Sequence, residues 1–172
     1  MNIFFLDKDP GLCAKYHCDR HLVQQINTVA QILSTVMRKS GIEYGFTAKN
    51  KEHPCVLWVE ESDENFLWLH KLGMELCREF SFRYSGNGSH RHTCEHLIRD
   101  THLESTGKNL QRKRRKKFKI TNPPQLISDH FKSDEVVKSY RDYYLVEKTK
   151  LLVYTKRQVP DWVSEMALGE HR

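Results

Sequence analysis

The sequence predicts a mainly α-helical protein, a single compact domain of four or five helices spanning residues 1–172, with a short extended segment at the N-terminus. Apolar residues recur at helical spacing in three separate stretches, which begin near residues 11, 62 and 133. A chain of 172 residues has the size of one domain, and a domain of this size buries roughly 70% of its unfolded surface. No internal repeat divides the chain.

The first helix is expected from about Gly11 to about Arg38. Residues 1–6 precede it as an extended start, and the Asp-Pro pair at 9–10 forms the turn that opens it. The Lys-Ser-Gly sequence that follows Arg38 supplies a basic last turn and a glycine stop. Residues 40–55 are expected to form a loop.

Two strong helices and a weaker one are expected next. The second helix begins at Ser62 or Asp63, either of which is a good N-cap, and ends near the sequence YSGNG. The weaker helical stretch covers about 90–104. The last helix starts near Ser133, and the irregular tail behind it should pack on the body of the protein through Trp162.

The positive charge is concentrated in residues 107–122, which we expect to be a flexible basic insert. The formal net charge of the chain is +6, and removing the eight basic residues of the insert leaves −2 for the rest. Basic side chains that contact phosphates release counterions, so the insert predicts salt-sensitive binding of nucleic acid, with DNA as the expected partner. The alternative is a solvated loop. The predicted nucleic-acid-binding residues are Lys108, Arg112, Lys113, Arg114, Arg115, Lys116, Lys117 and Lys119.

The composition also indicates an intracellular protein. Its five cysteines form an odd set without a Cys-x-x-Cys pair, which is typical of free thiols in a reducing compartment. The N-terminus lacks the layout of a secretory signal, and no segment approaches the ~20 apolar residues of a membrane span. The run RKRRKK has the composition of a nuclear-localisation signal, which would apply in a eukaryotic host. The sequence does not indicate an oligomeric state.

The stretch from His21 to Met37 contains no charged residue, unlike a solvent-facing helix. Its apolar stripe consists of Leu22, Ile26, Val29, Leu33 and Val36. A second, polar stripe, spaced by four and three, consists of His17, His21, Gln24, Thr28, Gln31 and Thr35. Two interpretations stay open: polar groups that are satisfied inside the core, or the wall of a binding pocket.

His17 and His21 are four residues apart, so on one helix their rings could converge on an ion or a proton-transfer centre. With Asp19 and Thr28 they form the candidate catalytic set, as a general acid or base or as phosphate contacts. A second cluster, HRHTCEH at 90–96, raises the alternative of a zinc site, although the spacing matches no standard zinc pattern. Metal ligands therefore stay unassigned, and zinc is the cofactor to test.

Seven side chains are candidates for ligand binding. Pro54 holds the preceding histidine extended, so that it could point back at the first helix. An arginine at the end of the second helix could hold a phosphate, or favour the negative helix terminus. Aromatic residues on the last helix could stack on bases, or form core. The set comprises Gln24, His53, Asn65, Arg83, Tyr140, Tyr144 and Lys148.

Several motifs follow one another in the order MNIFFLDKDP, HCDRH, AQILST, HPCVLWVEES, NFLWL, LCREFSFRY, YRDYY and KRQVPDW. In this order they resemble a family of small, mostly uncharacterised proteins that phages and large DNA viruses encode. The resemblance covers most of the chain outside the basic insert.

More distantly, the layout is similar to the phage pyrimidine-dimer DNA glycosylases, which are small all-α enzymes. The resemblance implies an N-terminal amine as nucleophile and a glutamate on the first long helix, seven residues after a histidine. Counting seven residues from His21 leads to Thr28, which cannot supply that negative charge. The amine would be that of Met1, because the bulky Asn2 disfavours removal of the methionine.

Together these features predict a viral or phage nucleic-acid-associated protein, a diverged glycosylase-like or DNA-modification enzyme with a histidine-lined pocket on the first helix. Two alternatives stay open. One is a viral interaction protein that modulates the host without catalysis. The other is a small zinc-dependent enzyme that acts on a nucleotide.

Overall fold

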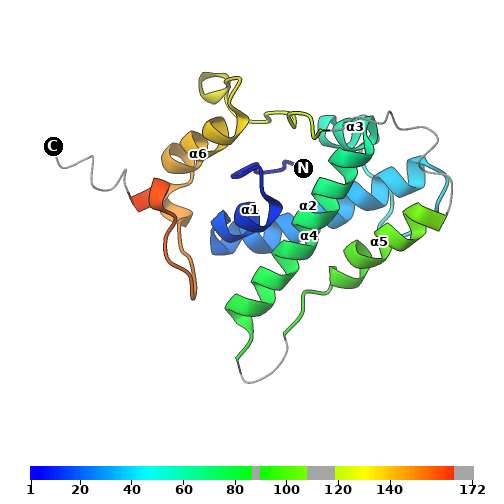
Figure 1. The fold of residues 1–172 in the computed structure, drawn as a ribbon, viewed down its shortest axis with the longest axis horizontal. Coiled ribbons are helices and arrows are strands. Elements are labelled where there is room, and N and C mark those ends of the chain that lie inside the picture. Colours follow the sequence, from blue (N-terminus) through cyan, green and yellow to red (C-terminus); the bar gives the residue numbers. More distant parts are fainter. Residues whose placement is uncertain (87–89, 108–118, 165–172) are drawn as a thin grey trace.

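The computed structural model describes residues 1–86, 90–107 and 119–164 (Figure 1). These residues form six α-helices, two short 3₁₀ helices and a further helical turn at 161–164, joined by loops. The α-helices are α1 (Pro10–Tyr16), α2 (Asp19–Lys39), α3 (Pro54–Glu61), α4 (Asp63–Tyr84), α5 (Glu95–Gly107) and α6 (Val136–Glu147). The 3₁₀ helices are η2 (Asp129–Phe131) and η3 (Thr149–Leu151). These residues contain no strand, so the expected mainly α fold is confirmed, with more helices than expected.

Helix α4 lies at the centre and packs against α1, α2, α3 and α5 (Figure 1). The expected apolar stripe of α2 is fully buried against this framework. The N-terminal segment forms neither helix nor strand, and it lies between the α2 and α4 pair and α6. Phe4 contacts His21 of α2 and Tyr144 of α6, while Phe5 packs on Trp68 of α4. Residues 3–6 are therefore part of the core.

The expected continuous first helix is wrong, because the chain breaks into α1 and α2 at His17 and Cys18. Both residues have extended backbone, with ψ angles of 128° and 159°. The cause lies in α4: the Arg83 guanidinium donates to the carbonyls of Lys15 and His17, at 2.9 Å each. These bonds satisfy carbonyl groups at the end of α1 that would otherwise lack partners. His17 and His21 are therefore not one turn apart on a single helix.

Helix α3 was not expected, because the His-Pro pair at 53–54 suggested a loop. In the structure Pro54 is the first residue of α3, where its missing N–H costs nothing, and the His53 ring accepts from the N–H of Cys55. The Ser62 hydroxyl caps α4 as expected, accepting from the N–H of Asn65.

The later elements differ in their bounds. Helix α5 starts at Glu95 rather than near residue 90, and α6 starts at Val136 rather than at Ser133. Trp162 packs against Tyr16 and Tyr144, which confirms the expected contact of the tail with the body. Among the described helices, none is both long and apolar enough to cross a membrane.

Candidate functional site

A cavity of about 460 Å³ opens where the N-terminus meets α2 and the loop that follows it. We call it the Met1 pocket, and its lining residues are Met1, Gln24, Asn27, Thr28, Gln31, Phe46 and Lys49. Three members of the expected polar stripe, Gln24, Thr28 and Gln31, form its floor. The other three members of the stripe, His17, His21 and Thr35, are buried and do not line the pocket.

The backbone beside Met1 is held in place by the side chain and carbonyl of Asn2. The Asn2 carbonyl accepts from Gln25 of α2 at 2.9 Å. The Asn2 amide donates to the carbonyl of Leu126 at 3.0 Å, and its oxygen accepts from the Tyr140 hydroxyl at 2.8 Å. Asn2 thus connects α2, the segment before η2, and α6. Tyr140, expected to bind a ligand, is fully buried and instead positions the N-terminus.

The loop between α2 and α3 forms the outer wall of the Met1 pocket. Side chains of α2 hold it: Arg38 donates to the carbonyls of Gly45 and Phe46, Gln31 donates to the carbonyl of Thr47, and the Thr35 hydroxyl accepts from the N–H of Lys49. At Gly45 the backbone has a φ of 68°, and a Cβ there would lie 2.2 Å from the hydroxyl of Ser34. Glycine is therefore required for the loop to lie this close to α2.

His53 lies beside the N-terminus, at the start of α3. Burial lowers the pKa of its imidazole, the positive charge of the Met1 amine lowers it further, and a hydrogen bond with the Met1 backbone opposes both. His53 was expected to point back toward the first long helix. It contacts Met1, and Met1 lines the pocket together with residues of α2. His53 itself is placed next to the pocket.

His17 and His21 are buried side chains outside the lining of the Met1 pocket. The His17 Nδ1 lies 2.7 Å from the carbonyl of Cys13, and the His21 Nδ1 lies 2.6 Å from the hydroxyl of Tyr144. Burial lowers the pKa of His17 to about 3 and, helped by the charges of Lys148 and Arg20, that of His21 to about 4. Both rings are therefore neutral near pH 7. Their catalytic role stays a prediction, while their geometry favours packing.

Acid should destabilise the fold through His17. Its pKa in the unfolded chain is about 6.5 and in the fold about 3, so between these values only the unfolded state binds the proton. Stability therefore falls as the pH falls through this window. At pH 5 the contribution of His17 is a loss of about 2 kcal/mol relative to pH 7 or above.

Chemical denaturation at pH 7 and pH 5 measures this effect. We expect the wild-type protein to lose more stability over this interval than His17→Asn, whose amide can still donate to the carbonyl of Cys13. Asparagine removes the titrating group. The quantity to compare is therefore the change in the free energy of unfolding between pH 7 and pH 5 in each protein, not its absolute value. Equal losses in both proteins would exclude His17 as the source.

The ion pairs of Arg83 stabilise the fold and lie outside the Met1 pocket. Its guanidinium is fully buried and contacts Glu79 and Asp19 at 2.8 Å each. The Asp19 carboxylate also accepts from Thr155, and Glu79 also binds Arg157. Burial alone would raise the pKa of Glu79, but hydrogen bonds from Arg157 and Arg83 hold it below the usual range. Two predicted site residues, Arg83 and Asp19, thus fasten the ends of α1, α2 and α4 to the tail.

Three more of the predicted binding residues have structural partners. Asn65 is buried, donates to the carbonyl of Trp58 and exchanges hydrogen bonds with Thr121. Tyr144 is fully buried beside His21, and Lys148 lies over the ring of Tyr143, 4.9 Å from its centroid. None of the three lines the Met1 pocket. These contacts join α3 and α4 to the segment at Thr121, and α2 to α6.

In the part of the chain that the structure describes, no group of three or more His, Cys, Asp or Glu side chains could hold a metal ion. The two histidine clusters do not come together there as a zinc site. His90 and His92 pack on Phe80, whereas His21 packs on Phe4.

Most of the predicted nucleic-acid-binding residues lie outside the described part of the chain. These are Lys108, Arg112, Lys113, Arg114, Arg115, Lys116 and Lys117. Lys119, the last of the set, is described and exposed.

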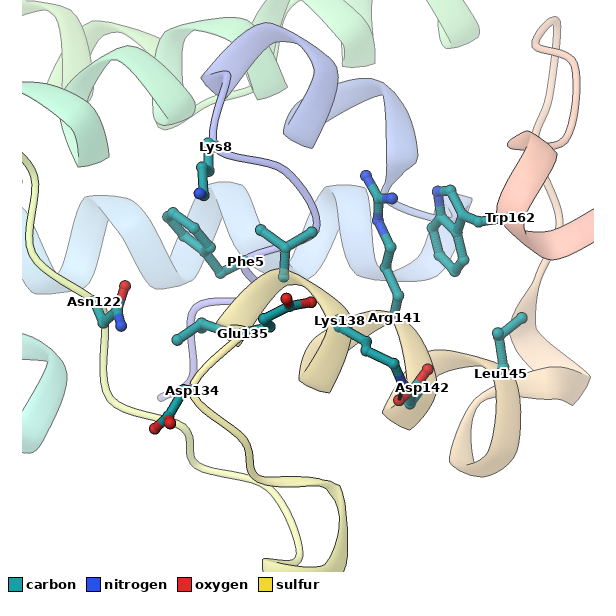
Figure 2. A pocket seen from close by; sticks show the side chains of 12 residues that line it. Phe5, Lys8, Asn122, Asp134, Glu135, Lys138, Arg141, Asp142, Leu145 and Trp162 are labelled. Carbon is teal, nitrogen blue, oxygen red and sulfur yellow. Dashed lines mark hydrogen bonds and ion pairs between the residues drawn. The ribbon is translucent and has the colours of Figure 1, made fainter.

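A larger cavity of about 570 Å³ lies between α6 and the N-terminal segment (Figure 2). Its lining mixes cations such as Lys8 and Lys138 with anions such as Asp134 and Asp142. The Arg141 side chain is already engaged, because it binds Asp7 at 2.9 Å and lies over the ring of Trp162. A surface of such mixed charge does not select one class of ligand.

Sequence reasoning missed several residues that complete the Met1 pocket. Asn27, Phe46 and Lys49 were not predicted as site residues. Phe46 and Lys49 lie in a loop without periodicity, and only the glycine before Phe46 hinted at a fixed backbone. Met1 was predicted as a candidate nucleophile through the resemblance to the glycosylases.

A family model described as pyrimidine dimer DNA glycosylase matches residues 1–92. A comparison with curated proteins returned no match, and a comparison with solved structures returned none either. The matched region contains Met1, α1 to α4 and every residue that lines the Met1 pocket. It covers more than half of the chain, and the chain belongs to the pyrimidine dimer DNA glycosylase family.

Proposed function

We propose that this protein binds damaged DNA at the Met1 pocket and can form an imine with an abasic site, while its excision of intact bases is strongly weakened. The family indicates DNA as the substrate and a role related to repair. As the resemblance to phage and large-DNA-virus proteins implies, we also propose a viral or phage origin and an intracellular site of action, nuclear in a eukaryotic host.

The observation that carries the proposal is the composition of the pocket. It brings the chain's first residue against uncharged polar groups of α2, with Lys49 at its wall. Among the described residues that line it, none is an aspartate or glutamate. Thr28 occupies the floor at the place where the resemblance implies a glutamate.

The two chemical steps of a glycosylase make different demands on this pocket. An abasic site offers an aldehyde, and the lone pair of an amine adds to its carbon. Loss of one water molecule then leaves a C=N bond. Breaking an intact glycosidic bond instead develops positive charge on the sugar, which a nearby carboxylate stabilises. The pocket can support the first step, whereas it lacks the group that favours the second.

Fluorescence anisotropy with duplex DNA tests the binding. We expect an abasic-site duplex to bind about tenfold more tightly than an intact duplex, the effect of one contact worth about 1.4 kcal/mol. Both affinities should fall as salt rises. Gln24→Ala, at the pocket floor, should reduce the preference, whereas Gln158→Ala, in the exposed tail, should leave it unchanged.

The buried histidines favour one second candidate, an interaction protein without catalysis. His17 and His21 have structural partners, so replacing them would cost stability without removing a ligand. Absence of DNA binding at low salt, with the fold intact, would contradict the first proposal and favour this one.

A further inference from the structure

Phe46 is an aromatic residue that the fold leaves partly exposed. Phe46 is 37% exposed, and it lines the Met1 pocket together with Gln24, Thr28 and Gln31 of α2. An isolated exposed aromatic ring is common on protein surfaces. The position of this ring, at a pocket in a family that acts on DNA, makes its exposure informative.

Side chains of α2 hold the backbone around Phe46 in place. The carbonyls of three consecutive residues, Gly45, Phe46 and Thr47, all accept hydrogen bonds from side chains of α2. The shortest two are 2.8 Å, from Arg38 to Phe46 and from Gln31 to Thr47. These bonds hold the loop backbone against α2. The backbone that carries the Phe46 ring is thus fixed beside the pocket before any ligand arrives.

The neighbours of the ring indicate the class of ligand. Gln24 and Thr28 offer neutral donors and acceptors, which match the edge of a nucleobase. Lys49 offers one positive charge, which matches a phosphate. A flat aromatic face, polar edges and a single cation fit a nucleotide whose base is not stacked within a duplex.

Resting on the proposed function, we propose that Phe46 is the stacking residue of the Met1 pocket and that Lys49 binds the phosphate of the same or the next nucleotide. The ligand is an unstacked base of single-stranded, abasic or distorted DNA. Stacking on Phe46 gives the protein its preference for such DNA over intact duplex. The α2 side chains Arg38 and Thr35 position the loop from outside the pocket lining, and Gln31 both lines the pocket and binds the loop.

The test uses single-stranded DNA and abasic duplex DNA that carry 2-aminopurine, a base whose fluorescence is quenched by stacking. The wild-type protein should quench it on binding. Phe46→Ala should abolish this quenching and weaken binding about 5- to 100-fold, the range expected for one stacked base. Phe46→Trp should retain both effects. Phe82→Ala, which removes another exposed phenylalanine, on α4, is the matched control and should match the wild type.

Salt dependence separates the role of Lys49 from that of Phe46. Lys49→Ala should reduce the slope of log affinity against log salt by about 1, because one phosphate contact is lost. Phe46→Ala should leave this slope unchanged, because stacking releases no counterions. Thermal unfolding of each variant checks that the fold is intact.

The outcomes distinguish this inference from the proposed function. If the wild-type protein binds no DNA, the proposed function fails. If it binds abasic DNA but Phe46→Ala binds equally well and quenches 2-aminopurine equally, DNA recognition stands and the stacking role of Phe46 is overturned.

Discussion

Replacing Arg83 by alanine should lower the free energy of unfolding by about 3–5 kcal/mol, the cost of removing one partner from a buried ion pair. The variant leaves Glu79, whose side chain is only 4% exposed, without one of its two arginines. It also leaves the carbonyls of Lys15 and His17 without donors at the break between α1 and α2. A loss of this size is a large share of the stability of an ordinary domain.

Urea denaturation monitored by circular dichroism measures the effect. Arg78→Ala is the matched control, because Arg78 belongs to the same helix and pairs with Glu75, but its side chain is 69% exposed. An exposed pair of this kind contributes about 0–1 kcal/mol. Similar losses for the two variants would contradict the role assigned to Arg83. If Arg83→Ala does not fold, Arg83→Lys, which keeps the charge but not the planar donors, should give an intermediate stability.

Replacing Thr28 by glutamate should create excision activity on DNA that carries a pyrimidine dimer. The new carboxylate would stand in the floor of the Met1 pocket, where positive charge develops on the sugar as the glycosidic bond breaks. One well-placed electrostatic group is worth about 100- to 1,000-fold in rate. We therefore expect an increase of about 100-fold over the wild-type protein, measured as strand cleavage after alkali treatment.

Thr28→Gln is the control for this experiment. Glutamine has the same length as glutamate but no charge, so it should bind dimer DNA without excising the base. Equal rates for Thr28→Glu and Thr28→Gln, with DNA binding preserved, would show that a missing carboxylate at this position does not limit the reaction.

Periodicity predicted the polar residues of α2 that line the Met1 pocket, because Gln24, Thr28 and Gln31 all belong to one helix. Gln24, Thr28 and Gln31 have the spacing of one helix face, and this face does line the pocket. The same reasoning placed His17 on that helix, which was wrong. The groups that hold the break at His17 come from Arg83, 66 residues away, so no local pattern could reveal them.

Contacts between distant segments explain the other differences. Asn65 has the sequence features of a helix-start residue, yet its side chain binds Thr121, 56 residues away. Tyr140 has the spacing of a core aromatic, and only the fold shows that its hydroxyl binds Asn2. The wall residue Phe46 lies in an irregular loop, where hydrophobic periodicity carries no signal.

Covalent trapping shows whether the Met1 pocket is where this protein meets damaged DNA. The protein, with a free Met1 amine verified by its intact mass, is incubated with abasic duplex DNA and borohydride, which reduces an imine to a stable amine. Digestion and mass spectrometry then locate the DNA. We expect attachment to the peptide that begins with Met1. Attachment to lysines elsewhere, or no adduct despite tight binding, would contradict it.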